Sequence, residues 1–250
     1  MVADTVHLAE ALDPIAPVEA APAPVRVSWD ESRRIPILMY HDLGTPASGL
    51  TVTPDALHKQ VDALVDAGYE AVSLDTVLRA LRGEPVWLPE KGVVLTFDDA
   101  YDGVYREAYP VLKSHGLKGT LFVIAGLVGR KGYVNWDQVR ELAADGWTIG
   151  CHTVHHQDLR LLGGKQLEDE VVLSRRVLQE NTGQAVVSFC YPAGKYDDLV
   201  IQAVKSGGYY GAVTTEPGIV AVRDAPFTLR RVRVDGRDGL DVFKAKLSIP

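Results

Sequence analysis

Short apolar runs alternate with longer amphipathic segments through most of this chain. The runs predict buried strands at 37–40, 71–74, 93–97, 119–124, 147–150, 186–190 and 211–214. Helical spacing and capping residues predict helices at 53–68, 75–81, 103–115, 135–144, 165–181 and 198–206. Repeated strand–helix units imply a parallel sheet, so we predict an α/β fold whose sheet forms a closed or nearly closed, distorted (β/α) barrel.

Two adjacent acids, Asp98 and Asp99, follow the apolar run that ends at Phe97. A bare carboxylate is costly to bury, so the pair needs partners. Side chains alternate along a strand, so one acid could bind a metal while the other acts as a base. A helix N-cap beside a surface acid is the ordinary alternative.

A histidine cluster follows another apolar run. His152, His155 and His156 are three of the seven histidines, and His152 and His156 are four residues apart. That spacing fits one helical face or a tight loop around a cation. Two histidines and one carboxylate form a recurring hydrolytic zinc set with a position left for water. A hydrogen-bonded pair in the core is the alternative, but both clusters lie at the carboxyl ends of predicted strands, where barrels carry their chemistry.

These motifs resemble a known family. The sequences TFDD at 96–99 and HTVHH at 152–156 resemble the polysaccharide deacetylases, carbohydrate esterase family 4. The stretch FCYPAG at 189–194 resembles the proline–glycine substrate loop of that family. The resemblance spans about 35–234 and implies a barrel of the polysaccharide deacetylase type.

The resemblance also implies roles for individual residues. Asp98 would be the base that takes a proton from water. A divalent cation, with Zn²⁺ favoured over Co²⁺, Ni²⁺ or Fe²⁺, would be held by Asp99, His152 and His156. The loop that faces the substrate and its oxyanion would comprise Tyr191, Pro192 and Ala193.

The chain departs from the family pattern at two places. Many members carry an arginine that holds the catalytic aspartate where Cys190 stands here, and we expect Arg230 or Arg231 to replace it. The late L-x-x-H motif, which supplies an acid histidine, is missing, because no histidine follows His156.

An L-x-x-H pattern occurs instead at 38–41, near the start of the chain. This opening, and the ending at 229–234, resemble the circularly permuted branch that includes the poly-N-acetylglucosamine deacetylases. His41 would then be the acid that protonates the leaving amine. Asp235 or Asp42 would orient its ring.

Length and charge are those of a soluble domain. The 250 residues suffice for one barrel core. The net charge of −7 argues against nucleic acid as a partner. We expect an N-acetylated glycan as substrate and a monomeric protein.

The first thirty residues differ from the rest. Prolines interleaved with alanines predict a flexible tether at 1–30, ahead of a catalytic domain at 31–250. The tether lacks the features of a signal peptide, and no apolar stretch reaches transmembrane length. Such tethers often follow a removed signal or anchor, so we predict an extracytoplasmic protein and keep a cytosolic one as the alternative.

Other residues carry open alternatives. Cys151 and Cys190 are expected to be buried free thiols, although an oxidising compartment would allow a disulfide. Tyr191 and Trp136 could face sugar rings or could simply pack in the core. His155 is expected to point away from the metal, and His115 to end a helix.

Together these features predict metal-dependent removal of N-acetyl groups from a polysaccharide of the poly-N-acetylglucosamine, chitin or peptidoglycan type. The same site could instead cleave an O-acetyl ester or a small cyclic amide. A glycan-binding module that has lost turnover is the non-enzymatic alternative, because the motif arginine is absent.

Overall fold

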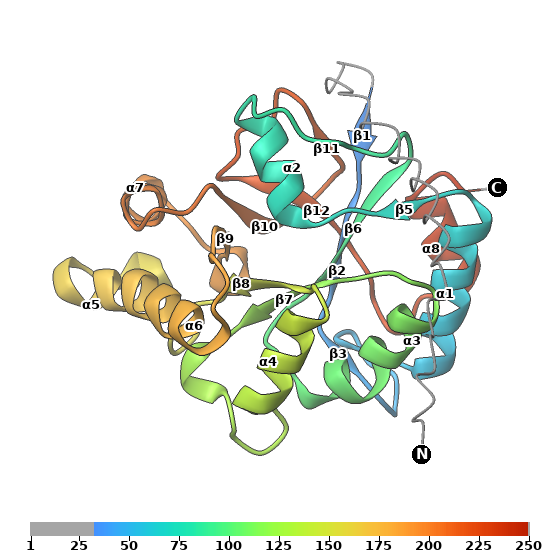
Figure 1. Ribbon diagram of the computed structural model, residues 1–250, viewed down its shortest axis with the longest axis horizontal. Coiled ribbons are helices and arrows are strands. Elements are labelled where there is room, and N and C mark those ends of the chain that lie inside the picture. The colour runs from blue at the N-terminus through green and yellow to red at the C-terminus, as the bar shows by residue number, and fades with distance from the viewer. Residues whose placement is uncertain (1–32, 250) are drawn as a thin grey trace, which may run out of the picture.

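The computed structural model describes residues 33–249, and the predicted tether lies outside them. Within this range seven parallel strands close into a barrel in the order β2-β12-β10-β9-β8-β7-β6, with β6 pairing back to β2 (Figure 1). The strands are β2 Ile37–Tyr40, β6 Gly92–Phe97, β7 Thr120–Val123, β8 Thr148–Cys151, β9 Ser188–Cys190, β10 Gly211–Pro217 and β12 Leu229–Arg233. The prediction of a parallel α/β barrel is confirmed.

The first and last barrel strands are neighbours. β12 pairs in parallel with β2 through Val232↔Leu38 and Arg233↔Met39. The shorter strands are β1 Arg34–Ile35 paired with β11 Val220–Ala221, β3 Asp42–Leu43 paired with β4 Thr51–Val52, and β5 Glu70–Ala71 beside β6. β2, the first barrel strand in the chain, therefore completes the barrel beside β12, the last one.

Helices surround the barrel in Figure 1. They are α1 Pro54–Asp66, α2 Leu74–Leu81, α3 Tyr109–Ser114, α4 Trp136–Ala144, α5 Gly164–Glu168, α6 Ser174–Thr182, α7 Asp198–Ser206 and α8 Leu240–Lys246. Two π-helical segments, η1 Val104–Ala108 and η4 Asp169–Leu173, run into α3 and α6, and 3-10 turns occur at η2 Ala125–Leu127, η3 Leu159–Leu161 and η5 Pro192–Gly194. Every one of these helices is too short or too polar to traverse a lipid bilayer.

Two apolar clusters hold the barrel together. The inner one joins strand residues such as Val94, Phe122 and Val213 to apolar residues of α2. A Cβ added at Gly211, the first residue of β10, would lie 2.4 Å from Leu78 of α2, so α2 closes the amino end of the barrel. The larger cluster lies between the strands and the outer helices.

Three predicted elements differ from the observed ones for local reasons. The strand predicted at 71–74 is β5 and ends at Ala71, because Ser73 caps α2 by accepting the N–H of Thr76. The helix predicted at 103–115 begins with the π segment η1. The helix predicted at 165–181 is interrupted by the π segment η4.

Candidate active site and metal centre

Asp98 follows β6 and is 2% exposed. Its carboxylate receives two parallel bonds from Arg231 of β12, Nη1 to Oδ1 at 2.8 Å and Nη2 to Oδ2 at 2.7 Å. Burial opposes the charged form, but the Arg231 guanidinium outweighs it and holds the pKa of Asp98 well below its usual range. Asp98 is therefore an ionised carboxylate in a closed environment.

Asp99 points to a different place because its backbone is left-handed, with φ +71°. Its Oδ1 lies 3.3 Å from Nε2 of His152 and 3.6 Å from Nε2 of His156. Ligands at about 2.0–2.1 Å from a tetrahedral Zn²⁺ are separated by roughly 3.4 Å. The three groups therefore fit one zinc ion, and their ligand atoms all lie within 4.8 Å of one another.

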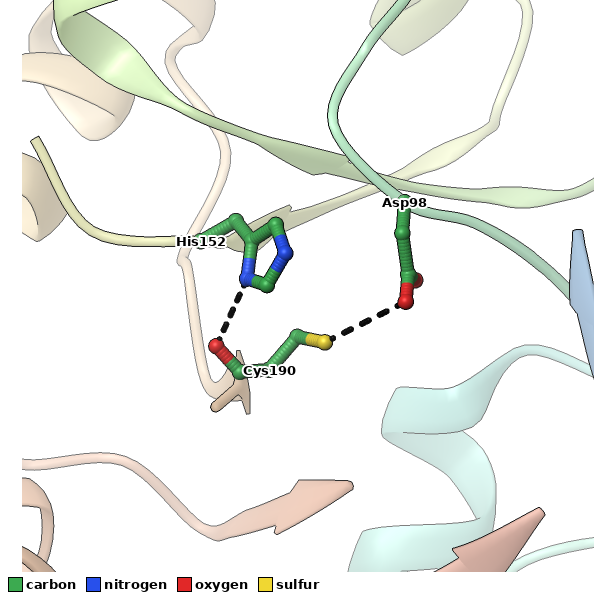
Figure 2. A group of neighbouring side chains, drawn as sticks. All are labelled: Asp98, His152 and Cys190. Atoms are coloured by element: carbon green, nitrogen blue, oxygen red, sulfur yellow. Dashed lines mark hydrogen bonds between the residues drawn. The ribbon is translucent and has the colours of Figure 1, made fainter. Parts of the chain in front are cut away.

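The tautomer of His152 is set by its second ring nitrogen. Nδ1 donates to the carbonyl oxygen of Cys190 at 2.8 Å, as Figure 2 shows. Nδ1 must carry the proton for this bond, so Nε2 is the ring nitrogen that could bind a metal. The strand end of β9 thus orients a candidate ligand at the end of β8.

A second group of metal-binding residue types overlaps the first. Asp98, His152 and Cys190 also lie within ligand distance of one another, and the Cys190 thiol contacts Asp98 Oδ2 at 3.5 Å (Figure 2). Burial raises the pKa of the Cys190 thiol, and Arg231 already binds both oxygens of Asp98. A metal needs deprotonated, unpaired ligands, so this group fits less well.

His155 and His156 point in different directions. His156 has a left-handed backbone, φ +58°, and its N–H donates to Thr153 Oγ1. The ring of His155 is 64% exposed and its Nδ1 donates to Glu170 at 2.6 Å. The two rings that face Asp99 are those of His152 and His156.

His41 follows β2 and lies close to the acid pair. Its Nε2 lies 4.0 Å from Asp98 Oδ2, and its side chain is 13% exposed. Burial lowers the pKa of His41, while the charges of Asp98 and Asp99 oppose that shift. The structure gives the two expected orienting carboxylates other partners: Asp235 binds Arg237, and Asp42 accepts the N–H of Leu43.

Of the two arginines expected beside Asp98, the structure brings only Arg231 to it. Arg230 faces outward and pairs with Asp224 at 3.4 Å. Arg231 also donates to Thr96 Oγ1 at 3.0 Å and to the carbonyl oxygen of Thr214. Thr96 was not singled out from the sequence, although its polar side chain inside an apolar strand was a signal.

The stretch that contains the proline–glycine loop meets the site at Cys190, whose carbonyl oxygen accepts from His152. Tyr191 is buried, and its hydroxyl donates to the carbonyl oxygen of Phe227 at 3.0 Å, so its ring belongs to the core. Pro192 is buried, whereas Ala193 is exposed with φ +52°. A Cβ at Gly194 would meet Thr215 at 2.0 Å, which explains the glycine. Trp136 is partly buried against the core.

The remaining expectations concern the cysteines and His115. Cys151 and Cys190 are both buried free thiols at the ends of neighbouring strands. Cys151 contacts Ser174 Oγ at 2.9 Å. His115 ends α3 and contacts the Val111 carbonyl oxygen and Asp62.

Comparisons with known proteins point to one family. A sequence model described as polysaccharide deacetylase matches residues 87–212. YxkH of Bacillus subtilis, a protein named for the same family, is 32% identical over 83% of this chain and 74% of its own length. The peptidoglycan-N-acetylmuramic acid deacetylase PdaA of the same organism is 29% identical over 62% of this chain and 54% of its own length.

Two further similarities concern a glycan deacetylase and a solved structure. The poly-β-1,6-N-acetyl-D-glucosamine N-deacetylase of Escherichia coli K12 is 33% identical over 38% of this chain, but only 16% of that enzyme is matched. The Streptococcus pyogenes deacetylase PplD, solved in complex with acetate, superposes with a TM-score of 0.80 at 31% identity. The match covers 85% of this chain and 97% of PplD.

Proposed function

The chain belongs to the polysaccharide deacetylase family, and from that premise we propose that it removes N-acetyl groups from a polysaccharide built of N-acetylglucosamine. The observation that carries the proposal is that a candidate metal site and an ionised carboxylate lie side by side at one end of the barrel. Asp99, His152 and His156 have the spacing of a zinc site, and beside them Asp98 is kept ionised by Arg231.

A divalent cation held by Asp99, His152 and His156 would lower the pKa of a water molecule and polarise the acetamide carbonyl. Asp98 would accept a proton from water, because it is ionised and adjacent to Asp99. Arg231 keeps the Asp98 carboxylate in one orientation through two bonds. The base is therefore fixed before substrate arrives.

The proton for the leaving amine comes from His41. Burial lowers the pKa of His41, the carboxylates of Asp98 and Asp99 offset part of that shift, and Asp98 lies 4.0 Å away. The Ala193 N–H, in a loop positioned by the buried Tyr191 and Pro192, donates to the oxyanion. These roles agree with those that the family resemblance implies.

The absence of the motif arginine was the main argument for a module without turnover. Arg231 binds Asp98 from a different strand, which removes that argument. The placement of β2 beside β12 supports a permuted chain and, with it, poly-N-acetylglucosamine as the preferred polymer. Such a polymer lies outside the cytoplasm, so we place the protein there as well.

The experiment is mass-spectrometric scoring of acetate release from oligomers of poly-β-1,6-N-acetylglucosamine, chitin, peptidoglycan and an O-acetylated glycan, with and without a chelator. We expect chelator-sensitive release, fastest from the first polymer. Release from an O-acetylated glycan alone would replace the amide proposal by an esterase, and no release from any of them would favour a binding module.

A further inference from the structure

A buried carboxylate holds the loop between the two candidate histidine ligands. Glu170 is 5% exposed. Its Oε2 accepts the backbone N–H groups of Val154 and His155, each at 2.9 Å, and its Oε1 accepts the Nδ1–H of His155 at 2.6 Å. A single side chain thus makes three bonds to the segment that joins His152 to His156.

That segment has a backbone that needs support. Thr153 and His156 are left-handed at φ +67° and +58°, a conformation that residues with a Cβ seldom adopt. Such residues persist only where surrounding contacts determine the backbone. Within the loop, Thr153 Oγ1 accepts the N–H of His156. From outside the loop, Glu170 binds its N–H groups, and the N–H groups of Ala125 and Gly126 donate to the carbonyl oxygens of Thr153 and Val154.

Glu170 is itself anchored on a rigid element. It lies in the π segment η4, a local widening of a helix that is frequent at functional sites. Its carbonyl oxygen accepts from Ser174 Oγ at 2.6 Å, and the same oxygen of Ser174 contacts the Cys151 thiol. Cys151 is the last residue of β8 and precedes His152. Residues of η4 and of the start of α6 therefore contact both the loop after His152 and the end of β8.

Burying a carboxylate is costly unless its bonds are satisfied. A carboxylate with a purely stabilising role could have accepted hydrogen bonds from its own helix. The three hydrogen bonds of Glu170 instead go to the loop that joins His152 to His156. We propose that Glu170 is a positioning residue of the metal site, which fixes His152 and His156 in the geometry that binds the divalent cation. The proposal rests on the metal site put forward above.

The test compares the zinc affinity of Glu170→Met and Glu170→Gln with that of the parent protein, by chelator competition. Methionine keeps the volume and removes both acceptors, so zinc binding should weaken by about 10–100-fold, as for other residues that orient metal ligands. Glutamine can still accept both backbone N–H groups with its oxygen, and its NH₂ can face a re-tautomerised His155. It should therefore restore most of the affinity.

Two controls separate positioning from general stability. Glu168→Ala changes an exposed acid at the end of α5 and should leave zinc affinity unchanged. His155→Ala removes one of the three bonds and should keep metal. The visible spectrum of the Co²⁺-loaded protein should change in Glu170→Met but not in Glu168→Ala, because it reports ligand geometry.

Glu170→Met that binds zinc as tightly as the parent would overturn the proposal. Should that variant not fold, Glu170→Asp takes its place, since a carboxylate one methylene shorter cannot reach both N–H groups, and parental affinity there would equally overturn it. A parent that binds no divalent cation would instead contradict the proposed function.

Discussion

The neighbouring side chains of Asp98 and Asp99 have different partners because the backbone changes direction at Asp99. The side chain of Asp98 points to Arg231 and binds it. Asp99 has a left-handed backbone, with φ +71°, and its side chain faces His152. The alternation of side chains predicted separate tasks for the pair, but not which acid would take which. The family resemblance made that assignment, which stays a prediction.

Asp98→Asn should keep the zinc and lose turnover by about 10²–10⁴-fold, because only the base is removed. Asp99→Ala should lose both, because a ligand is gone. Metal analysis beside acetate release measures the two outcomes. Near-parental activity of Asp98→Asn would place the base elsewhere.

His41→Ala should fold, retain zinc and lose about 10²–10⁴-fold in rate on an amide, whose amine leaves poorly without a proton. An activated aryl acetate has a leaving group that needs no proton, so the same variant should keep more of its activity there. Equal losses on both substrates would mean that His41 shapes the site and donates nothing.

At the scale of elements, strands with continuous apolar runs were predictable and the exceptions have local causes. The run at 93–97 corresponds to β6, which begins one residue earlier, and the run at 147–150 corresponds to β8, which lies one residue later. The sequence could not decide between Arg230 and Arg231, because that depends on the register of β12 against β2. Glu170 was missed because it belongs to a π segment, although it sits on the apolar stripe of its helix, three residues after Leu167.

Gly150→Ala tests how closely β8 is packed inside the barrel. The added Cβ would lie 2.5 Å from the Phe122 ring and 3.0 Å from Ser188 Oγ. Overpacking of this kind costs about 1–3 kcal/mol of unfolding free energy, which a urea titration measures. Gly163→Ala, whose Cβ meets nothing within 4 Å, is the control. Parental stability of Gly150→Ala would show that β8 can shift freely.

At the scale of the whole molecule, the closed barrel gathers residues that are far apart in sequence. His41, Asp98, His152 and Arg231 come from four strands and meet at one end. Strand–helix alternation predicted the barrel, but only the family resemblance indicated that the first strand would complete it. The opposite end, closed by α2, carries an acid with a buried oxygen atom that the sequence did not single out.

That acid, Asp75, makes stability depend on pH. Its Oδ1 has no hydrogen-bond partner in the described part of the chain, and burial raises the pKa of Asp75 to about 7, against the opposing effects of Ser188 and Arg79. Between the unfolded pKa near 3.9 and about 7, the folded state binds the extra proton. Stability should therefore fall as pH rises through that window.

Asp75→Asn removes this dependence. It should raise the unfolding free energy at pH 8, by up to about 4 kcal/mol for a shift of three units, and change it little at pH 4. Urea titrations at the two pH values measure the difference. Asp55→Asn, at the same position in the first turn of α1 but exposed, should show no such gain. Equal effects of both substitutions would contradict a raised pKa at Asp75.

The most direct test of the account is a titration of Zn²⁺ into metal-free protein while acetate release from N-acetylglucosamine oligomers is recorded. We predict no release without metal and a rise that saturates at one ion per chain. His156→Ala should need far more zinc, and His155→Ala should follow the parent. Release by the metal-free parent, or equal zinc requirements for the two histidine variants, would contradict the assignment of Asp99, His152 and His156 as the metal site.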